Sequence, residues 1–130
     1  MPSAQNLRIL IVDDQASMRG LTRYCLEQLG IRNVTEANCG ADALQELQVA
    51  KFDLVISDWN MDKIDGLELL KTIRSNPLTR MTPFIMSTGN KEREKVQIAI
   101  KAGVNNYIVK PFNVATLKQK IEAVLGPITK

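Results

Sequence analysis

The sequence predicts an α/β fold in which helices cover both faces of a parallel sheet. Short apolar runs alternate with segments of helical periodicity, and this alternation occurs five times along the chain. The apolar runs are nearly continuous, which is typical of strands buried on both faces. The chain has 130 residues, of which 45% are hydrophobic and 24% are charged. This size and composition suit one globular domain.

The five predicted strands are the short apolar runs. The first reads RILIV, with no polar residue after its first position, and the third reads FDLVIS. Such runs are too short for helices and lack helical spacing. In chain order the predicted strands are Arg8–Val12, Asn33–Ala37, Phe52–Ser57, Pro83–Ser87 and Asn106–Val109.

Five helices are predicted between and after these strands, because apolar residues recur there at spacings of three and four. Glycine closes the first, fourth and fifth helices, and an Asn-Pro pair closes the third. The apolar stripes or helical ranges are Met18–Leu29, Ala41–Ala50, Leu67–Ile73, Lys91–Ala102 and Val114–Leu125.

Composition excludes several functional classes. The chain has no histidine, so histidine metal ligands and histidine acid–base catalysis are excluded. Its 17 Lys+Arg and 14 Asp+Glu residues give a net charge of +3 without a dense basic stripe, so we expect no nucleic-acid partner. No apolar run approaches ~18 residues, and the N-terminus lacks a secretory signal. We therefore expect a cytoplasmic protein with no membrane partner.

The cysteines and the spacing of the elements indicate a simple organisation. Cys25 and Cys39 form no C-x-x-C pair, and Cys25 lies on an apolar helical face. We expect both to remain reduced, without a disulfide. No linker, repeat or low-complexity segment interrupts the chain. The range 1–130 is therefore expected to form a single domain with no attached output domain.

Polar residues follow four of the five predicted strands. Asp13 and Asp14 come directly after the first strand, Asp58 after the third, Thr88 after the fourth and Lys110 after the fifth. The carboxyl ends of parallel strands form the edge at which open α/β sheets bind ligands. Taken singly, Asp14 could be only a helix N-cap, Thr88 a turn residue and Lys110 a solvated side chain. Their shared position at one edge favours a functional site.

The residue types at this edge suit phosphoryl chemistry. Three neighbouring carboxylates repel one another, and a hard divalent cation such as Mg²⁺ relieves that repulsion. An aspartate at the centre of such a site can act as a nucleophile toward phosphorus. Lys110 and Thr88 would then balance charge and donate a hydrogen bond to the transferred oxygens.

Two other kinds of site are excluded by spacing. If Asp58 were the first position of a calcium loop, the sixth should be glycine and the twelfth glutamate, but these are Lys63 and Leu69. The chain also has neither G-x-x-x-x-G-K-[ST] nor G-x-G-x-x-G. The motifs of common nucleotide sites are therefore missing.

Several segments together identify a family. They are ILIVDDQASMR, VISDWNM, DGLELLKTIRSN, MSTGN and NYIVKPFNVATLKQKI. In this order and at these spacings, the chain resembles response-regulator receiver domains over nearly its whole length, and most closely the CheY-type chemotaxis regulators. The resemblance implies a flavodoxin-like, doubly wound sheet of five parallel strands in the order 2-1-3-4-5, with five helices.

The resemblance also implies roles for the residues at the sheet edge. Asp58 would accept a phosphoryl group from a phosphohistidine of a sensor histidine kinase of the CheA type. Asp13, Asp14, Asp58 and the backbone carbonyl of Asn60 would hold Mg²⁺. Thr88 and Lys110 would contact the phosphoryl oxygens, and the Lys110–Pro111 bond is expected to be cis. Tyr107 would be an aromatic switch that turns inward as Thr88 moves.

The family's usual partner surface comprises the fourth helix, the fifth strand and the fifth helix. Its target in motile bacteria is the flagellar motor switch, so a part in flagellar rotation is expected, together with a monomeric state and a possible separate phosphatase. On this chain the face would include Lys91, Arg93, Lys95, Val96, Ile100, Tyr107, Val109 and Lys120.

The chain departs from the family pattern near the site. Asp62 stands where proline is usual, and Gly89 stands where alanine is common. Asn90 replaces an acidic or longer residue of many relatives. We hypothesise that Asn60 and Asn90 tune dephosphorylation, because they flank the path of the hydrolytic water.

The leading interpretation is a phosphorylation-switched response regulator of a two-component system, working in chemotaxis. It would catalyse only its own phosphorylation and dephosphorylation and would have no external substrate. A CheY-type phosphate sink is an alternative. A metal-dependent phosphohydrolase is less favoured, because such enzymes usually show D-x-D after the first strand, whereas this chain has Asp13-Asp14. A purely structural adaptor would have no use for the polar residues at the edge.

Overall fold

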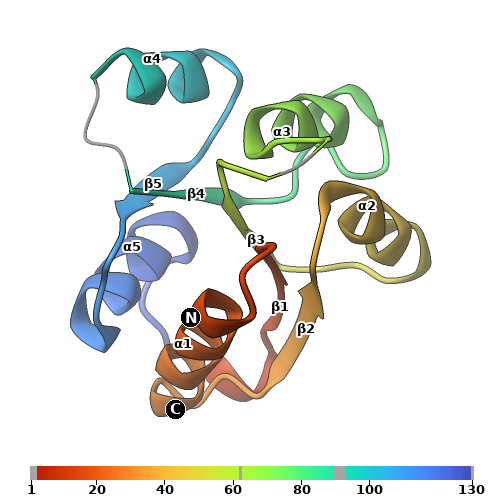
Figure 1. Cartoon of the computed structure of the whole chain (residues 1–130). Helices are drawn as coiled ribbons and strands as arrows, with labels where there is room; N and C mark the ends of the chain where they lie inside the picture. The colour runs from red at the N-terminus through yellow and green to blue at the C-terminus, as the bar shows by residue number, and fades with distance from the viewer. Residues whose placement is uncertain (1–2, 62, 90–92, 130) are drawn as a thin grey trace.

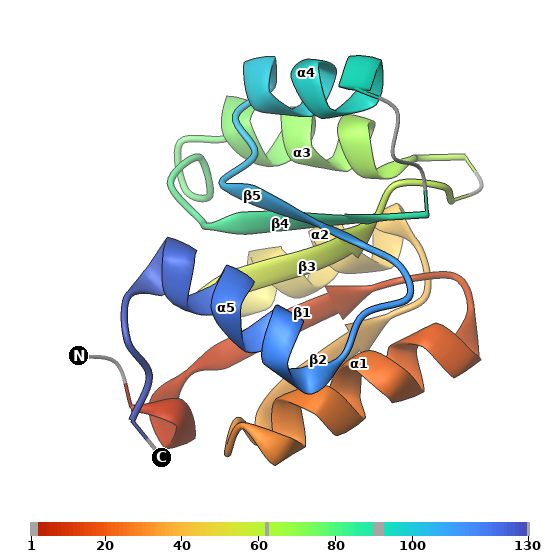
Figure 2. The same ribbon diagram turned by 90° about the vertical axis from the view of Figure 1, so that its left-hand side faces the viewer.

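The computed structural model describes residues 3–61, 63–89 and 93–129, and it shows one parallel sheet between two layers of helices (Figures 1 and 2). The strand order is β2-β1-β3-β4-β5, which confirms the predicted doubly wound, flavodoxin-like fold. A short 3-10 helix at Ala4–Asn6 precedes the sheet. The strands are β1 (Arg8–Val12), β2 (Asn33–Ala37), β3 (Leu54–Asp58), β4 (Phe84–Thr88) and β5 (Asn106–Val109).

Five helices follow the strands in alternation. Figure 1 shows α1 and α5 on one face of the sheet and α2, α3 and α4 on the other. Within the described residues, no helix is long and apolar enough to cross a membrane. The helices are α1 (Ala16–Gln28), α2 (Gly40–Val49), α3 (Gly66–Ser75), α4 (Arg93–Lys101) and α5 (Val114–Leu125).

Two apolar cores fill the two faces, because successive side chains of a strand point to opposite sides. On β1, Ile9 and Ile11 pack with α1 and α5, whereas Leu10 and Val12 pack with the helices of the other face. Every residue of β3 and β4 is buried. The central strands are therefore fixed on both faces, and their carboxyl ends are held firmly in place.

The bounds of two strands differ from the prediction by one or two residues. β3 and β4 begin later than predicted and end at Asp58 and Thr88, which the sequence pattern had placed just beyond the strands. The reason is backbone pairing: Asp58 lies opposite Ser87, and Thr88 lies opposite Val109. Patterns of side-chain polarity do not report these backbone bonds. The predicted helix start at Lys91 lies outside the described residues.

Arg74, in the last turn of α3, ties three segments of the opposite edge together. Its Nε donates to the carbonyl of Gly103 at 3.0 Å, and its Nη1 donates to the carbonyls of Thr82 at 2.7 Å and Arg80 at 3.1 Å. Its Nη2 donates to Oδ1 of Asn105 at 2.9 Å. Burial lowers the pKa of Arg74. One side chain thus links α3 to the segment before β4 and to the turn between α4 and β5.

Candidate functional site

Three carboxylates meet at the carboxyl edge of the sheet. Asp13 and Asp14 follow β1, and Asp58 ends β3, which is hydrogen-bonded to β1. One carboxylate oxygen from each lies within 4.8 Å of the others. Asp13 and Asp58 are only 4% and 6% exposed, whereas Asp14 is exposed. The parallel strands therefore bring together acidic groups that are 45 residues apart in the chain, two of them shielded from water.

Asp13 is held by contacts on every polar atom. Its N–H donates to the carbonyl of Ala37 at 3.1 Å. Its Oδ1 accepts from the backbone N–H of Gln15 at 2.9 Å, and its Oδ2 accepts from Nζ of Lys110 at 3.3 Å. Its carbonyl accepts from Nη1 of Arg19 at 2.6 Å. This carboxylate is thus positioned before any ligand arrives.

Lys110 supplies a positive charge to the cluster. Its Nζ lies 2.9 Å from Oδ1 of Asp58 and 3.3 Å from Oδ2 of Asp13, and its side chain is 16% exposed. Its backbone N–H donates to the carbonyl of Thr88 at 2.8 Å, which fixes it at the end of β4. The Lys110–Pro111 bond is cis, as the family resemblance implies.

The charge balance of the cluster favours a divalent cation. Three carboxylates against the Lys110 ammonium leave an excess of negative charge among the described residues of this edge. Burial raises the pKa of Asp58, and the charge of Asp13 raises it further. The hydrogen bond and charge of Lys110 and the backbone N–H of Asn60 lower that pKa, but the effect of burial is larger. A hard cation with oxygen ligands would offset this cost, so the residues present fit Mg²⁺.

Thr88 and Tyr107 lie on the neighbouring strands β4 and β5. Thr88 is buried as the last residue of β4, and Tyr107 on β5 is half-buried. Nζ of Lys120, from α5, lies 4.9 Å from the centroid of the Tyr107 ring, which is a cation–π contact. Two members of the predicted partner face therefore contact each other.

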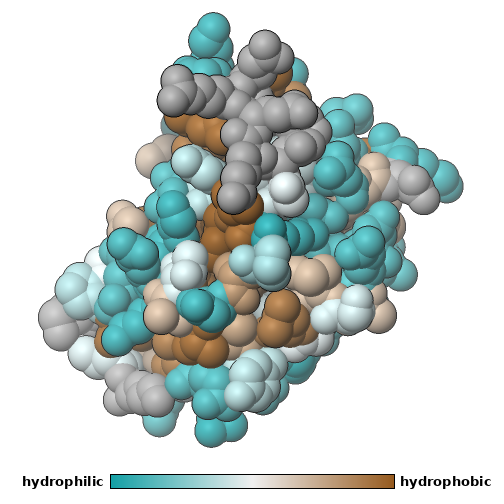
Figure 3. Space-filling model, turned by 60° about the vertical axis from the view of Figure 1, so that its left-hand side comes forward, coloured by the Kyte–Doolittle hydropathy of each residue, from teal (hydrophilic) through white to brown (hydrophobic). Residues whose placement is uncertain are grey.

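The rest of the predicted partner face lies on α4 and β5. Val96 and Val109 are half-buried, and Ile100 is 54% exposed. Figure 3 shows hydrophobic atoms in the middle of this side of the molecule, with hydrophilic atoms around them. Asn90 and Lys91 lie outside the described residues, as do Asp62 and the side chains of Arg93 and Lys95.

Two further positions near the site are open to solvent. Asn60 is exposed next to Asp58, and Gly89 is exposed next to Thr88. A Cβ atom at Gly89 would meet no atom within 4 Å. The lack of a side chain at Gly89 thus leaves open space directly after Thr88.

Gly66, the first residue of α3, is a site residue that the sequence pattern does not reveal. Its N–H donates to the carbonyl of Trp59 at 2.9 Å. A Cβ atom here would clash with the carbonyl oxygen of Asp58 and lie 2.7 Å from Sδ of Met86. Only glycine allows α3 to start this close to the backbone of Asp58. The available signal was a glycine directly before the predicted helix at Leu67–Ile73, a position where the backbone can approach a neighbour closely.

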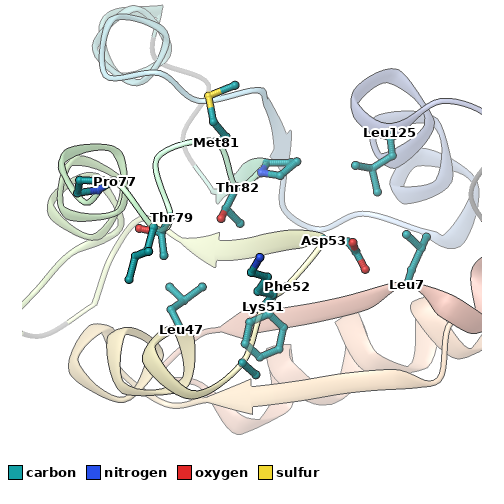
Figure 4. A pocket seen from close by; sticks show the side chains of 13 residues that line it. Leu7, Leu47, Lys51, Phe52, Asp53, Pro77, Thr79, Met81, Thr82 and Leu125 are labelled. Atoms are coloured by element: carbon teal, nitrogen blue, oxygen red, sulfur yellow. The ribbon is translucent and has the colours of Figure 1, made fainter.

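A cavity of about 530 Å³ lies at the opposite edge of the sheet (Figure 4). Its lining includes Leu7, Phe52 and Pro83, which precede β1, β3 and β4. None of the residues predicted for the acidic site lines it. This cavity is therefore separate from the acidic site.

Neutralising Asp14 is expected to weaken cation binding without harming the fold. In Asp14→Asn the cluster loses an exposed carboxylate, so we expect the Kd for Mg²⁺ to rise at least about tenfold. The free energy of unfolding without Mg²⁺ should stay within about 0.5 kcal/mol of the wild-type value. Titration followed by Trp59 fluorescence and urea unfolding measure the two quantities. Asp42→Asn, an exposed aspartate in the first turn of α2, is the control and should bind Mg²⁺ normally.

Comparison with known proteins gives consistent matches. The family model described as the response regulator receiver domain matches residues 9–122. Chemotaxis protein CheY-3 of Vibrio cholerae is 44% identical over 120 residues, which are 92% of each chain. Chemotaxis protein CheY1 of Helicobacter pylori is 43% identical over 121 residues, which are 92% of this chain and 98% of that protein.

Solved structures show the same likeness. Chemotaxis protein CheY4 of Vibrio cholerae superposes with a TM-score of 0.86 at 36% identity, covering 92% of this chain and 98% of that one. The receiver domain of the sensor histidine kinase PA1611 of Pseudomonas aeruginosa superposes with a TM-score of 0.85 at 27% identity, covering 95% and 100%. That domain was solved with a magnesium ion coordinated in its active-site cleft.

Proposed function

The chain belongs to the response regulator receiver domain family, and on that basis we propose that it is a phosphorylation-switched response regulator of a two-component system in bacterial chemotaxis. The observation that carries the proposal is the cluster of Asp13, Asp14 and Asp58 with Lys110 2.9 Å from Asp58. Ionisable groups whose pKa values are shifted by burial and by specific charged partners, as for Asp58, are typical of functional sites.

Asp58 is the proposed phosphoryl acceptor. A carboxylate oxygen attacks the phosphorus of a phosphohistidine on a CheA-like sensor kinase, the O–P bond forms and the P–N bond breaks. The imidazole nitrogen keeps the electron pair of the broken bond. Mg²⁺ held by Asp13, Asp14, Asp58 and the carbonyl of Asn60 would neutralise charge on the transferred oxygens. The chain has no external substrate in this scheme and catalyses only its own phosphorylation and dephosphorylation.

Lys110 and Thr88 respond to the new charge. Lys110 bridges Asp58 and Asp13, so its ammonium is in place to pair with a phosphoryl oxygen on Asp58. Thr88 would donate its hydroxyl hydrogen to another oxygen. The exposed rim at Asn60 would admit the water that later hydrolyses the acyl phosphate, at a rate that Asn60 and Asn90 tune.

The output is a change in the face formed by α4, β5 and α5. Phosphorylation would favour a conformation in which Tyr107 turns inward as Thr88 moves. Because Lys120 lies over the Tyr107 ring, this movement would release Lys120 toward a partner. The proposed partner is a flagellar motor switch protein, bound in the cytoplasm by a monomer, and a separate phosphatase would end the signal.

The test is phosphorylation by acetyl phosphate, measured by mass spectrometry of the intact protein. We expect wild type to gain one phosphoryl group only with Mg²⁺, and Asp58→Asn to gain none. Asp53→Asn is the matched control, because Asp53 lies near the other end of the same strand, where its carboxylate accepts a backbone N–H. It should be phosphorylated like wild type.

Two results would contradict the proposal. Wild type that stays unmodified with Mg²⁺ and acetyl phosphate would exclude a phosphoacceptor role. Undiminished labelling of Asp58→Asn would place the acceptor elsewhere. If the phosphorylated protein does not bind the motor switch protein of its own organism more tightly than the unphosphorylated form, the phosphate-sink role replaces the motor role.

A further inference from the structure

An ion-pair network behind the acidic site joins α1 to β2. Glu36 on β2 binds two arginines of α1: its Oε1 lies 3.2 Å from Nε of Arg19, and its Oε2 lies 2.6 Å from Nη1 of Arg23. Nε of Arg23 also lies 3.6 Å from Oε1 of Glu27. The Arg19 side chain is 19% exposed and Glu36 is 32% exposed. The pair is thus partly shielded from water, unlike an ordinary surface ion pair.

The same Arg19 reaches the acidic site from behind. While its Nε binds Glu36, its Nη1 donates to the carbonyl of Asp13 at 2.6 Å. That carbonyl belongs to the peptide bond between Asp13 and Asp14. Because a peptide unit is planar, the direction of its carbonyl fixes the start of the Asp14 residue as well. One guanidinium therefore orients the peptide that carries two of the three carboxylates.

We propose that Arg19 is a positioning residue for the acidic site, and that Glu36 sets the affinity of this site for a divalent cation by holding Arg19 against the Asp13 carbonyl. The proposal rests on the proposed function, since it assumes that the cluster binds Mg²⁺. It assigns a role to two residues that lie outside the cluster itself.

The chemistry of the two side chains explains why this pair suits the task. A guanidinium is a planar fork whose nitrogens can bind a carboxylate and a carbonyl at the same time, whereas an ammonium is a single point donor. The positive charge of Arg19 lies against the peptide that carries two of the carboxylates. Glu36 offers a competing carboxylate at the back of the site. Without it, Arg19 would be drawn toward the cluster and would compete with the cation.

Measuring Mg²⁺ affinity by isothermal titration calorimetry tests the proposal. Arg19→Met removes the tether on the Asp13 carbonyl, and we expect Mg²⁺ to bind about tenfold more weakly, as for other residues that orient metal ligands. Glu36→Gln leaves Arg19 with its charge but without its charged partner, and we expect roughly two- to fivefold weaker binding. Arg19→Lys should resemble Arg19→Met, because lysine cannot make both contacts.

Arg23→Met is the matched control. Arg23 binds the same carboxylate of Glu36, but no contact joins it to Asp13 among the described residues. We expect this variant to lose as much stability in Mg²⁺-free urea unfolding as Arg19→Met, yet to bind Mg²⁺ like wild type. A general loosening of the ion-pair network would weaken Mg²⁺ binding equally in both variants, and that result would overturn the proposal.

The double variant Arg19→Met/Glu36→Gln shows whether Glu36 affects Mg²⁺ affinity through Arg19 or independently of it. If Glu36 acts through Arg19, the double variant should bind Mg²⁺ no more weakly than Arg19→Met alone. Additive losses would contradict the proposal. Failure of the proposed function is distinguishable, since wild type itself would then bind no Mg²⁺ and accept no phosphoryl group. Wild-type Mg²⁺ affinity in Arg19→Met, with wild type phosphorylated at Asp58, would overturn the inference alone.

Discussion

Replacing Gly66 with alanine is expected to destabilise the protein by about 3 kcal/mol and to disturb the acidic site as well. The new methyl group would clash with the carbonyl oxygen of Asp58 and lie 2.9 Å from Cα of Trp59. Both are backbone atoms of buried residues at and directly after the end of β3, so neither can move without displacing β3 or α3. Alanine favours a helix over glycine by about 1 kcal/mol, which is too little to offset the clash. The displaced Asp58 should also bind Mg²⁺ more weakly.

Gly20→Ala provides a matched control for this prediction. Gly20 lies inside α1, and a Cβ atom there would meet no atom within 4 Å. The same substitution should therefore stabilise the protein by about 0.5–1 kcal/mol. Urea unfolding of both variants without Mg²⁺ gives the comparison. If Gly66→Ala were as stable as Gly20→Ala, that result would contradict the close contact between the start of α3 and the backbone of Asp58.

Arg74→Met is the second substitution with a large expected effect, a loss of about 3 kcal/mol. Methionine keeps much of the apolar stem but removes four hydrogen bonds. Hydrogen bonds to charged groups contribute about 1.5–3 kcal/mol each when buried, and half-burial of Arg74 reduces that sum. The carbonyls of Gly103 and Thr82 would also lose a partner. Denaturant unfolding measures the loss, and Mg²⁺ affinity should remain unchanged because Arg74 lies at the opposite edge.

Two further variants identify the cause. Arg74→Lys keeps the charge but offers one nitrogen in place of three, so it should lose most of the same stability. Arg80→Met removes an exposed arginine nearby and should change the free energy of unfolding by less than about 0.5 kcal/mol. If Arg74→Lys were as stable as wild type, the positive charge, rather than the several hydrogen bonds of the guanidinium, would account for the stabilisation.

The main features of the fold were predictable because strand burial and helical periodicity are local signals. The position of the acidic site was predictable as well: Asp13, Asp58 and Lys110 occur at strand ends, and parallel strands present those ends at one edge. The strand bounds were less accurate, since Asp58 and Thr88 belong to the strands through backbone pairing. Side-chain polarity carries no information on that pairing.

The supporting contacts were not predictable from the chain, for a physical reason. Arg74 finds its partners 29 and 31 residues away, and Arg19 meets Glu36 across 17 residues. An arginine that will be half-buried and fully paired looks the same in a sequence as one that stays in water. Gly66 was only slightly more predictable, because a glycine at the start of a helix can indicate close packing but does not identify the group it packs against.

The hydrogen bond between Lys110 and Asp13 joins residues 97 positions apart, and this span has a consequence for folding. Contacts of such long range form only after the entropy of closing a large loop has been overcome. Until β5 has added to the edge of the sheet, the carboxylates have no Lys110 ammonium beside them. A chain that has folded only its first three strand–helix units therefore has the aspartates but lacks the counter-charge. Under the proposed function, we therefore expect only chains in which the sheet is complete to accept a phosphoryl group.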